Sequence, residues 1–221
     1  MIYDIHVHTN VVDGRYSPRQ VVEHAKKIGL NGIAIVDHDE VRGNIEARKY
    51  AGKDFTIVPG LEFSTTQGHI LCLGSTDVPE EYLGAMFKKE NYRSPGEIVD
   101  LIHDIGGIAI AAHPYDRVRS AVGDLVYRLP FDAIEVVNGH TLSNTKDPAK
   151  AADELKLPKV GGSDAHSLHE IGNICVEAEG GDIVEAIRSN HVRIVRKGRL
   201  SLLAGFLRSG ILKSYFGLEK Y

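Results

Sequence analysis

The stretches GIAIVDH at residues 32–38 and GIAIAAH at residues 107–113 decide the fold class of this chain. Each is a short apolar run that ends in a histidine. Such runs are typical of strands that are buried on both faces, as in parallel sheets covered by helices. Helix-start signals occur between the apolar runs. At residues 17–20 and 94–97, a serine is followed by proline and then, three residues after the serine, by Gln or Glu. This is the pattern of a capping box with proline in the first turn.

Strands and helices are expected to alternate along the chain. Strands are expected at residues 2–8, 32–38, 56–64, 69–74, 107–113, 133–138, 159–164, 173–179 and 191–196. Helices are expected at residues 17–29, 43–51, 94–106, 124–129, 148–155, 182–190 and about 200–217, with an irregular excursion at 79–93. The alternation predicts βαβ units in an α/β fold, and about seven or eight such units predict a compact barrel. We interpret residues 1–221 as one barrel domain on which the last helix packs.

The amino-acid composition argues against several classes of function. Lys and Arg total 26 and Asp and Glu total 30, so the formal charge is −4. This balance argues against a general surface for nucleic acid or anionic membranes, although a local basic cleft is compatible with it. Two cysteines do not make a disulfide scaffold. We find no signal peptide and no apolar run of membrane-spanning length, so we expect a cytoplasmic protein without a membrane partner. The unusual count is 11 His against 2 Met and no Trp.

The histidines and several carboxylates fall where the predicted strands end. In a parallel barrel the carboxyl ends of the strands share one face. Nine side chains are therefore expected to converge there: His6, His8, Asp13, His38, Glu62, His69, His113, Asp164 and His166. His69 differs from the others because it stands at the start of a strand, the second strand of a predicted hairpin, rather than at a strand end.

These residue types are ligands for Zn, Mn or Fe. His6 and His8 are two apart, so a regular strand directs both to one face, and Asp164 and His166 share that spacing. Glu62 has two oxygens and could bridge two ions. A single histidine at a strand end is more often a hydrogen-bonded packing residue, but nine converging groups favour a multinuclear metal site. Three carboxylates would leave two or three divalent ions with a net positive charge, which suits an anionic phosphate ester.

Eight segments, taken together, resemble the PHP (polymerase and histidinol phosphatase) superfamily of metal-dependent phosphoesterases. They are HVHTN at 6–10, DGRYSP at 13–18, GIAIVDHDEVRG at 32–43, GLEFS at 60–64, GHILCLG at 68–74, AAHPYD at 111–116, IEVVNG at 134–139 and GGSDAHS at 161–167. The resemblance implies a distorted (β/α)7 TIM-like barrel that holds two to three divalent ions. The loop at 13–18 and the stretch VDHDEVRG at 36–43 resemble the branch that acts on small nucleotides more than the histidinol phosphatase branch.

The resemblance also implies a ligand set for each ion. One ion would be held by His6, His8, Glu62 and Asp164. A second would be held by Glu62, His69 and His113. A third would be held by Asp13, His38 and His166, with Asp13 standing where other members carry His. For the reaction itself, we expect Asp164 to orient or deprotonate the attacking water, and His166 or a water on the third ion to protonate the leaving oxygen. The implied reaction is attack on phosphorus by a hydroxide that bridges the first two ions.

The expected substrate is a small phosphorylated metabolite or nucleotide. Arg15 and Arg117 lie in loops at the barrel mouth and could grip phosphate, and His140 and His169 could contact substrate or support the ligands. Asp37 and Asp39 could each orient an imidazole. Histidinol-phosphate phosphatase, exonuclease and a non-catalytic RNA-binding barrel stay as alternatives. No stable nucleic-acid partner is expected, and the last helix could form a homo-oligomer contact.

Overall fold

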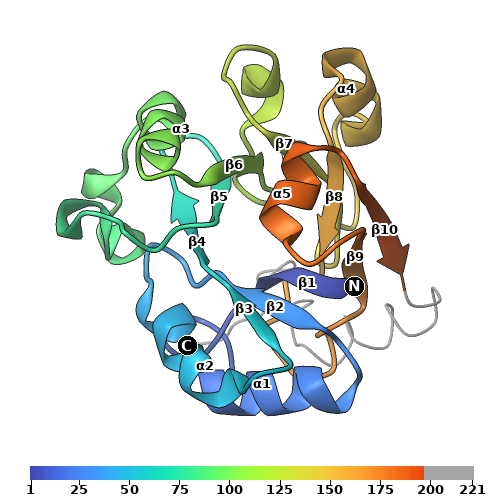
Figure 1. The fold of residues 1–221 in the computed structure, drawn as a ribbon. Helices are drawn as coiled ribbons and strands as arrows, with labels where there is room; N and C mark the ends of the chain where they lie inside the picture. The colour runs from blue at the N-terminus through green and yellow to red at the C-terminus, as the bar shows by residue number, and fades with distance from the viewer. Residues whose placement is uncertain (197–221) are drawn as a thin grey trace.

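The computed structural model describes residues 1–196, apart from the side chains of Phe87 and Lys89. Two five-stranded sheets form its centre (Figure 1). The first sheet contains, in spatial order, β10 (Val192–Arg196), β9 (Ile174–Ala178), β1 (Ile2–Val7), β2 (Gly32–Ile35) and β3 (Thr56–Val58). The second contains β4 (Gly60–Ser64), β5 (His69–Leu73), β6 (Ile108–Ala111), β7 (Ala133–Asn138) and β8 (Lys159–Gly162). The predicted α/β class is confirmed.

The two sheets are joined at two places in the barrel wall. The single strand predicted at 56–64 is divided at Pro59 into β3 and β4, which belong to different sheets. An isolated parallel bridge pairs His38 with Glu62, and another pairs Val7 with Ala165. The wall is therefore joined by single bridges at these two places rather than by continuous ladders, which is the distortion of the barrel.

Strand direction places the polar ends on one edge. β1 and β2 are parallel, as are β6, β7 and β8. β5 runs antiparallel to both β4 and β6, as the predicted hairpin requires. The first residue of β5 therefore lies at the edge where its neighbours end, and this residue is His69.

A register shift in β1 changes which side chains face the interior. The pairing of β1 with β2 is irregular between Asp4 and Val7. Ile5 belongs to the apolar cluster inside the barrel, whereas Val7 belongs to the cluster between the first sheet and its helices. In a regular strand residues two apart share a face, so the irregularity turns the strand over between these residues. His6 and His8 then lie on the inner side.

The helices cover the outside of the wall. α1 (Pro18–Lys27) and α2 (Arg42–Ala51) pack on the first sheet, while α3 (Pro95–Asp104) and α4 (Pro148–Leu155) pack on the second (Figure 1). Both predicted capping boxes are present, at Ser17 with Gln20 and at Ser94 with Glu97.

The remaining elements complete the barrel. α5 (Ile183–Arg188) packs its apolar side chains into the interior cluster. Arg188 donates to the carbonyl of Gly107, just before β6, so α5 closes the end opposite the strand ends. The excursion at 79–93 contains three short 3₁₀ turns, η1 (Glu80–Tyr82), η2 (Ala85–Phe87) and η3 (Lys89–Asn91).

Two helix expectations differ from the structure or fall outside it. The helix expected at 124–129 is the 3₁₀ helix η4 (Gly123–Tyr127), with no side-chain cap at its start. The helix expected at about 200–217, and its packing on the barrel, lie outside the described residues. Within residues 1–196, no helix combines the length and the apolar character needed to cross a bilayer.

The capping role of Ser94 at the start of α3 can be tested by substitution. Ser94 Oγ accepts the backbone N–H of Glu97 at 3.3 Å, and Glu97 Oε2 accepts the backbone N–H of Ser94 at 2.9 Å. We expect Ser94→Ala to lower the free energy of unfolding by about 1 kcal/mol, measured by denaturant titration. Ser94→Asp keeps a capping oxygen and is the control. Equal losses in both variants would contradict the capping role.

Candidate metal centre

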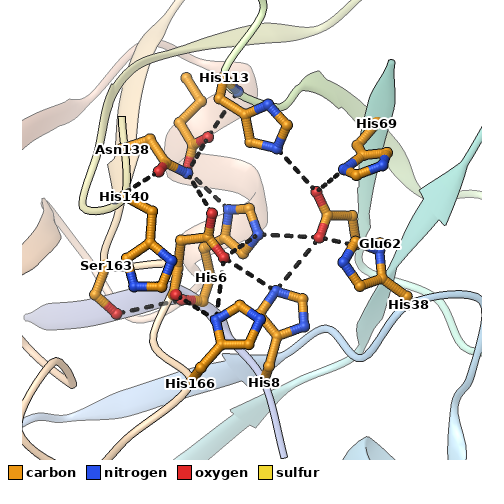
Figure 2. Close-up of polar contacts among 12 residues, drawn as sticks. His6, His8, His38, Glu62, His69, His113, Asn138, His140, Ser163 and His166 are labelled. Atoms are coloured by element: carbon orange, nitrogen blue, oxygen red, sulfur yellow. Dashed lines mark hydrogen bonds and ion pairs between the residues drawn. The ribbon is translucent and has the colours of Figure 1, made fainter. Parts of the chain in front are cut away.

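The structure brings all nine predicted ligands together at the carboxyl edge of the barrel wall, and Figure 2 shows the histidines among them around Glu62. They come from β1 and the loop after it (His6, His8, Asp13), from β4 and β5 (Glu62, His69), and from the segments after β2, β6 and β8 (His38, His113, Asp164, His166). The convergence expected from strand order is therefore observed.

Glu62 lies at the centre of the cluster and is 1% exposed. Each of its oxygens faces a different set of imidazoles. Oε2 lies 3.2–3.4 Å from ring nitrogens of His6, His8 and His38. Oε1 lies 3.4 Å from ring nitrogens of His69 and of His113. One carboxylate thus serves two adjacent groups of nitrogen donors.

Asp164 extends the first of these groups. Its Oδ1 lies 3.5 Å from His6 Nε2 and 3.2 Å from His8 Nε2. Its Oδ2 faces the other way and accepts from Asn138 Nδ2 at 3.0 Å and from Arg119. The two oxygens therefore have separate partners, and only Oδ1 faces the histidines of β1.

Asp13 is the centre of the third predicted group. Its Oδ2 lies 3.0 Å from His166 Nε2 and 3.8 Å from His38 Nε2, and its Oδ1 lies 3.6 Å from His8 Nδ1. The side chains of Asp13 and His166 are 27% and 21% exposed, whereas Glu62 and Asp164 are buried. The cluster is therefore open to solvent on the Asp13 side.

The electrostatics of the cluster are dominated by its carboxylates. Burial alone would lower the pKa of His6, but Asp164, Glu135 and Glu62 hold it well above its usual value. Burial likewise opposes the shift of His8, whose pKa Asp13, Asp164 and Glu62 raise to about 10. Burial lowers the pKa of His38 to about 3 despite the Glu62 carboxylate.

The carboxylates shift in the opposite sense. Burial alone would raise the pKa of Glu62, but His38 and His6 hold it well below its usual value. For Asp164, burial is outweighed in the same way by His6 and Arg119. The carboxylates are therefore anionic, and they are balanced by positive charge on neighbouring rings.

The donor set fits divalent metal ions. Six buried side-chain atoms of the described residues lack a hydrogen-bond partner, and five of them belong to this cluster. They are His8 Nδ1 and Nε2, His38 Nδ1, His113 Nδ1 and Glu62 Oε1. Unpaired buried polar atoms are costly. Imidazole nitrogens and carboxylate oxygens are the donors that Zn, Mn and Fe accept, so ions at this place would satisfy them.

Backbone strain occurs at two of the nine residues. His113 has φ +30° and Asp164 has φ +54°. Non-glycine residues rarely adopt this region, and strained backbone of this kind costs about 1–3 kcal/mol and concentrates at functional sites. Both residues follow directly on a strand of the second sheet, where the strain turns the chain at the cluster.

Three supporting residues were not predicted. Glu135 Oε1 lies 2.9 Å from His6 Nδ1, and Glu135 Oε2 accepts the backbone N–H of His113 at 2.8 Å. Asn138 donates to Glu135 as well as to Asp164. A glutamate inside the apolar strand AIEVVN was a signal for this role. For Arg119 we see no sequence signal that separates it from Arg117 in the same loop.

The four predicted substrate contacts differ in their exposure to solvent. Arg15, Arg117 and His169 are exposed, whereas His140 is buried and its Nε2 lies 2.9 Å from Glu170 Oε1.

The suggested role of Asp37 and Asp39 in orienting an imidazole finds no support in their hydrogen bonds. Asp37 accepts from the backbone N–H and hydroxyl of Thr9, at 2.6 and 2.7 Å. Asp39 accepts the backbone N–H of Ser64 at 2.9 Å. Both carboxylates hold the loops that carry the ligands, rather than the rings themselves.

Family comparison agrees with this geometry. Residues 4–121 match the model of the PHP domain, and residues 148–192 match that of the PHP-associated region. The chain belongs to the PHP family. The matched segments contain every one of the nine clustered residues.

Relatives of known sequence include proteins of unknown and of assigned activity. The uncharacterized protein MJ1587 of Methanocaldococcus jannaschii is 34% identical over 151 residues, which are 62% of this chain and 81% of that protein. The 5′-3′ exoribonuclease Rnm of Escherichia coli is 30% identical over 105 residues, which are 42% of this chain but 36% of that enzyme.

Among solved structures, a two-domain protein of Bacteroides vulgatus contains a predicted PHP-like metal-dependent phosphoesterase. It superposes with a TM-score of 0.68 at 19% identity, over 94% of this chain and 69% of that one. This PHP chain therefore has the fold of PHP-like metal-dependent phosphoesterases.

The position of Glu62 gives a test of metal binding. We expect Glu62→Ala to lose more bound metal than His69→Ala, because Glu62 faces both groups of imidazoles and His69 only one. The measurement is elemental analysis after loading and gel filtration. His103→Ala, in α3 and outside the cluster, is the control. Full metal content in Glu62→Ala would be evidence against a bridging carboxylate.

The raised pKa values of His6 and His8 predict pH-dependent metal binding. Because the pKa of His8 is about 10, its ring is protonated at neutral pH without metal, and a cation must displace that proton. The apparent affinity should therefore rise with pH and fall as the solution becomes acidic. Calorimetry in buffers of different ionisation enthalpy measures the protons released. Binding without proton release would contradict these protonation states.

Proposed function

We propose that this protein is a metal-dependent phosphoesterase that hydrolyses a small phosphorylated metabolite or nucleotide. The observation that carries the proposal is the Glu62 carboxylate, with three imidazoles at one oxygen and two at the other. This geometry supports two neighbouring cation positions that share one ligand. Paired ions of this kind are suited to displacement at phosphorus.

We assign the ligands in three sets. His6, His8, Glu62 and Asp164 hold the first ion. Glu62, His69 and His113 hold the second. Asp13, His38 and His166 hold a third, on the open side. When bound, divalent Zn, Mn or Fe would polarise a phosphoryl oxygen and lower the pKa of a coordinated water to about 7.

The protein's own groups provide orientation and proton transfer. Asp164 is fixed through Oδ2 by Asn138 and Arg119, so Oδ1 is the oxygen that can accept a proton from the attacking water. His166 lies at the open side with its Nδ1 2.9 Å from the carbonyl of Asp164. We assign it the transfer of a proton from Nε2 to the leaving oxygen in the form of the site that holds only the first two ions. Arg15 and Arg117 are the proposed phosphate contacts outside the cluster, and His169 is a proposed contact to the rest of the substrate.

A nuclease is the second candidate. It is favoured by the matching segment of the Escherichia coli exoribonuclease and by the exposed arginines Arg15 and Arg117. A phosphodiester chain would need contacts along several nucleotides, which the net charge of −4 does not favour. Small phosphomonoesters are therefore the first choice.

The experiment is a phosphate-release screen with protein loaded with Mn or Zn. Its substrates are nucleotides, 3′,5′-bisphosphates, histidinol phosphate and sugar phosphates, with shortening of single-stranded oligoribonucleotides followed in parallel. Preference for histidinol phosphate or for oligoribonucleotides would replace the first choice by the corresponding alternative. No hydrolysis of any of these by the loaded protein would contradict the proposal.

Substitution of the ligands tests the assigned chemistry. We expect His8→Ala and Asp164→Ala to lower kcat by at least about 10³-fold while the fold is retained, because each removes a donor that the first ion requires. Circular dichroism checks the fold. His103→Ala should keep the wild-type rate. Activity in His8→Ala would show that the ligand assignment is wrong.

A further inference from the structure

Glu170 is a buried carboxylate beside His166, and it belongs to none of the three proposed ligand sets. The residue is 3% exposed. Its Oε2 accepts the backbone N–H of His166 at 3.0 Å, the backbone N–H of Ser167 at 2.8 Å and the Ser167 hydroxyl at 2.9 Å. Its Oε1 lies 2.9 Å from His140 Nε2. One carboxylate thus contacts both the backbone of His166 and the ring of His140.

The ring of His166 is oriented by stacking and by one hydrogen bond. It stacks with the ring of His140 at a centroid distance of 5.1 Å and with that of His8 at 4.4 Å (Figure 2). Its Nδ1 lies 2.9 Å from the carbonyl oxygen of Asp164, which can only accept, so Nδ1 donates. A ring that binds metal is neutral, and its lone pair is then on Nε2. This atom lies 3.0 Å from Asp13 Oδ2.

The backbone of His166 also holds the loop that carries Asp13. The carbonyl of His166 accepts the backbone N–H of Arg15 at 3.0 Å, two residues beyond Asp13. Glu170 therefore supports His166 directly and Asp13 through His166. These are two of the three ligands of the third set, and both are partly exposed to solvent. Little packing holds their side chains on that side, so the hydrogen bonds from below determine their position.

The ligands of the first ion have supports of their own. The backbone N–H of His8 donates to the carbonyl of Ala165 at 2.8 Å, next to the bridge between Val7 and Ala165. Asp164 is fixed through Oδ2 by Asn138 and by an arginine. Loss of the Glu170 contacts would leave these bonds in place. The carboxylate of Glu170 is thus placed to act on the third set selectively.

We propose that Glu170 is a positioning residue for the third cation. It fixes His166, and through His166 the loop of Asp13, so that His166 Nε2 and Asp13 Oδ2 are held where one ion can bind both. The role depends on the reach of the side chain to His140 and to the backbone N–H groups together. The inference rests on the proposed metal centre.

The test measures the number and the affinity of ions bound by the whole chain. Titration with Mn²⁺, followed by calorimetry and by elemental analysis, gives both values. Asp13→Ala identifies the third ion, because Asp13 belongs to that set alone. We expect Glu170→Ala to weaken the binding of this ion about 10- to 100-fold, as removal of a group that supports a ligand usually does. The affinity for the other two ions should be unchanged.

Two conservative variants separate position from charge. Glu170→Gln keeps the length of the side chain and an oxygen that can accept the same three hydrogen bonds. It should retain most of the affinity for the third ion. Glu170→Asp keeps the charge but is one methylene shorter, so it cannot contact His140 and the backbone N–H groups together. It should weaken the third ion as the alanine variant does. The opposite order of the two variants would overturn the positioning role in favour of an electrostatic one.

Asp132→Ala is the matched control. Asp132 Oδ2 accepts the backbone N–H of Ala109 at 2.7 Å and lies 2.9 Å from His103 Nε2, so it makes the same kinds of contact away from the cluster. This variant should bind every ion with wild-type affinity. A loss equal to that of Glu170→Ala would show a general effect of destabilisation and would overturn the specific role of Glu170.

Failure of this inference can be told apart from failure of the proposed function. If the wild type binds no divalent ion, the proposed function fails before the variants are compared. If the wild type hydrolyses phosphate esters but binds only two ions, or if Glu170→Ala binds the third ion with wild-type affinity, the role of Glu170 is overturned and the proposed function stands. Should the alanine variant fail to fold, wild-type affinity for the third ion in Glu170→Asp would overturn the role by itself.

Discussion

The ion-pair geometry around the Glu62 carboxylate is the constraint on which the rest of the site depends. At this buried group, imidazoles from β1, from β5 and from the segments after β2 and β6 meet a shared anion. A buried charge needs partners on all its lone pairs. β4 places Glu62 next to the bridge where the two sheets join, so the fold closes around the carboxylate that the ligands share.

A second layer of polar residues fixes the ligands from behind. Glu135 contacts His6 and the backbone of His113, Asn138 joins Glu135 to Asp164, and Arg119 completes the row. Networks of this kind are rigid when every member is paired. The positive φ values of His113 and Asp164 show that the chain tolerates strain to present these two groups.

The charge at the mouth of the barrel differs from the formal charge of the whole chain. The formal charge is −4, yet three of the carboxylates lie in the cluster, where protons or bound cations neutralise them. An acidic total is therefore compatible with an anionic phosphate substrate. The most exposed members of the cluster are Asp13, at 27%, and His166 and His69, at 21% each.

Features that depend on local interactions could be predicted from the amino-acid sequence. Both capping boxes and the bounds of β7 and α4 follow from neighbouring residues, and the nine ligands could be named because parallel strands end on one face. The helix expected at 124–129 is present as the 3₁₀ helix Gly123–Tyr127, so a helical segment was predicted but its hydrogen-bond pattern was not.

Features that depend on contacts between residues far apart in the chain could not be predicted from the sequence. The turn-over of β1 that sends His6 and His8 inward comes from its pairing with β2. The selection of Arg119 over Arg117 comes from the position of Asp164, 45 residues further along the chain. The burial of His140 depends on Glu170 in the same way, 30 residues away. Local propensity contains none of these contacts, because each forms only when separate strands have closed the barrel.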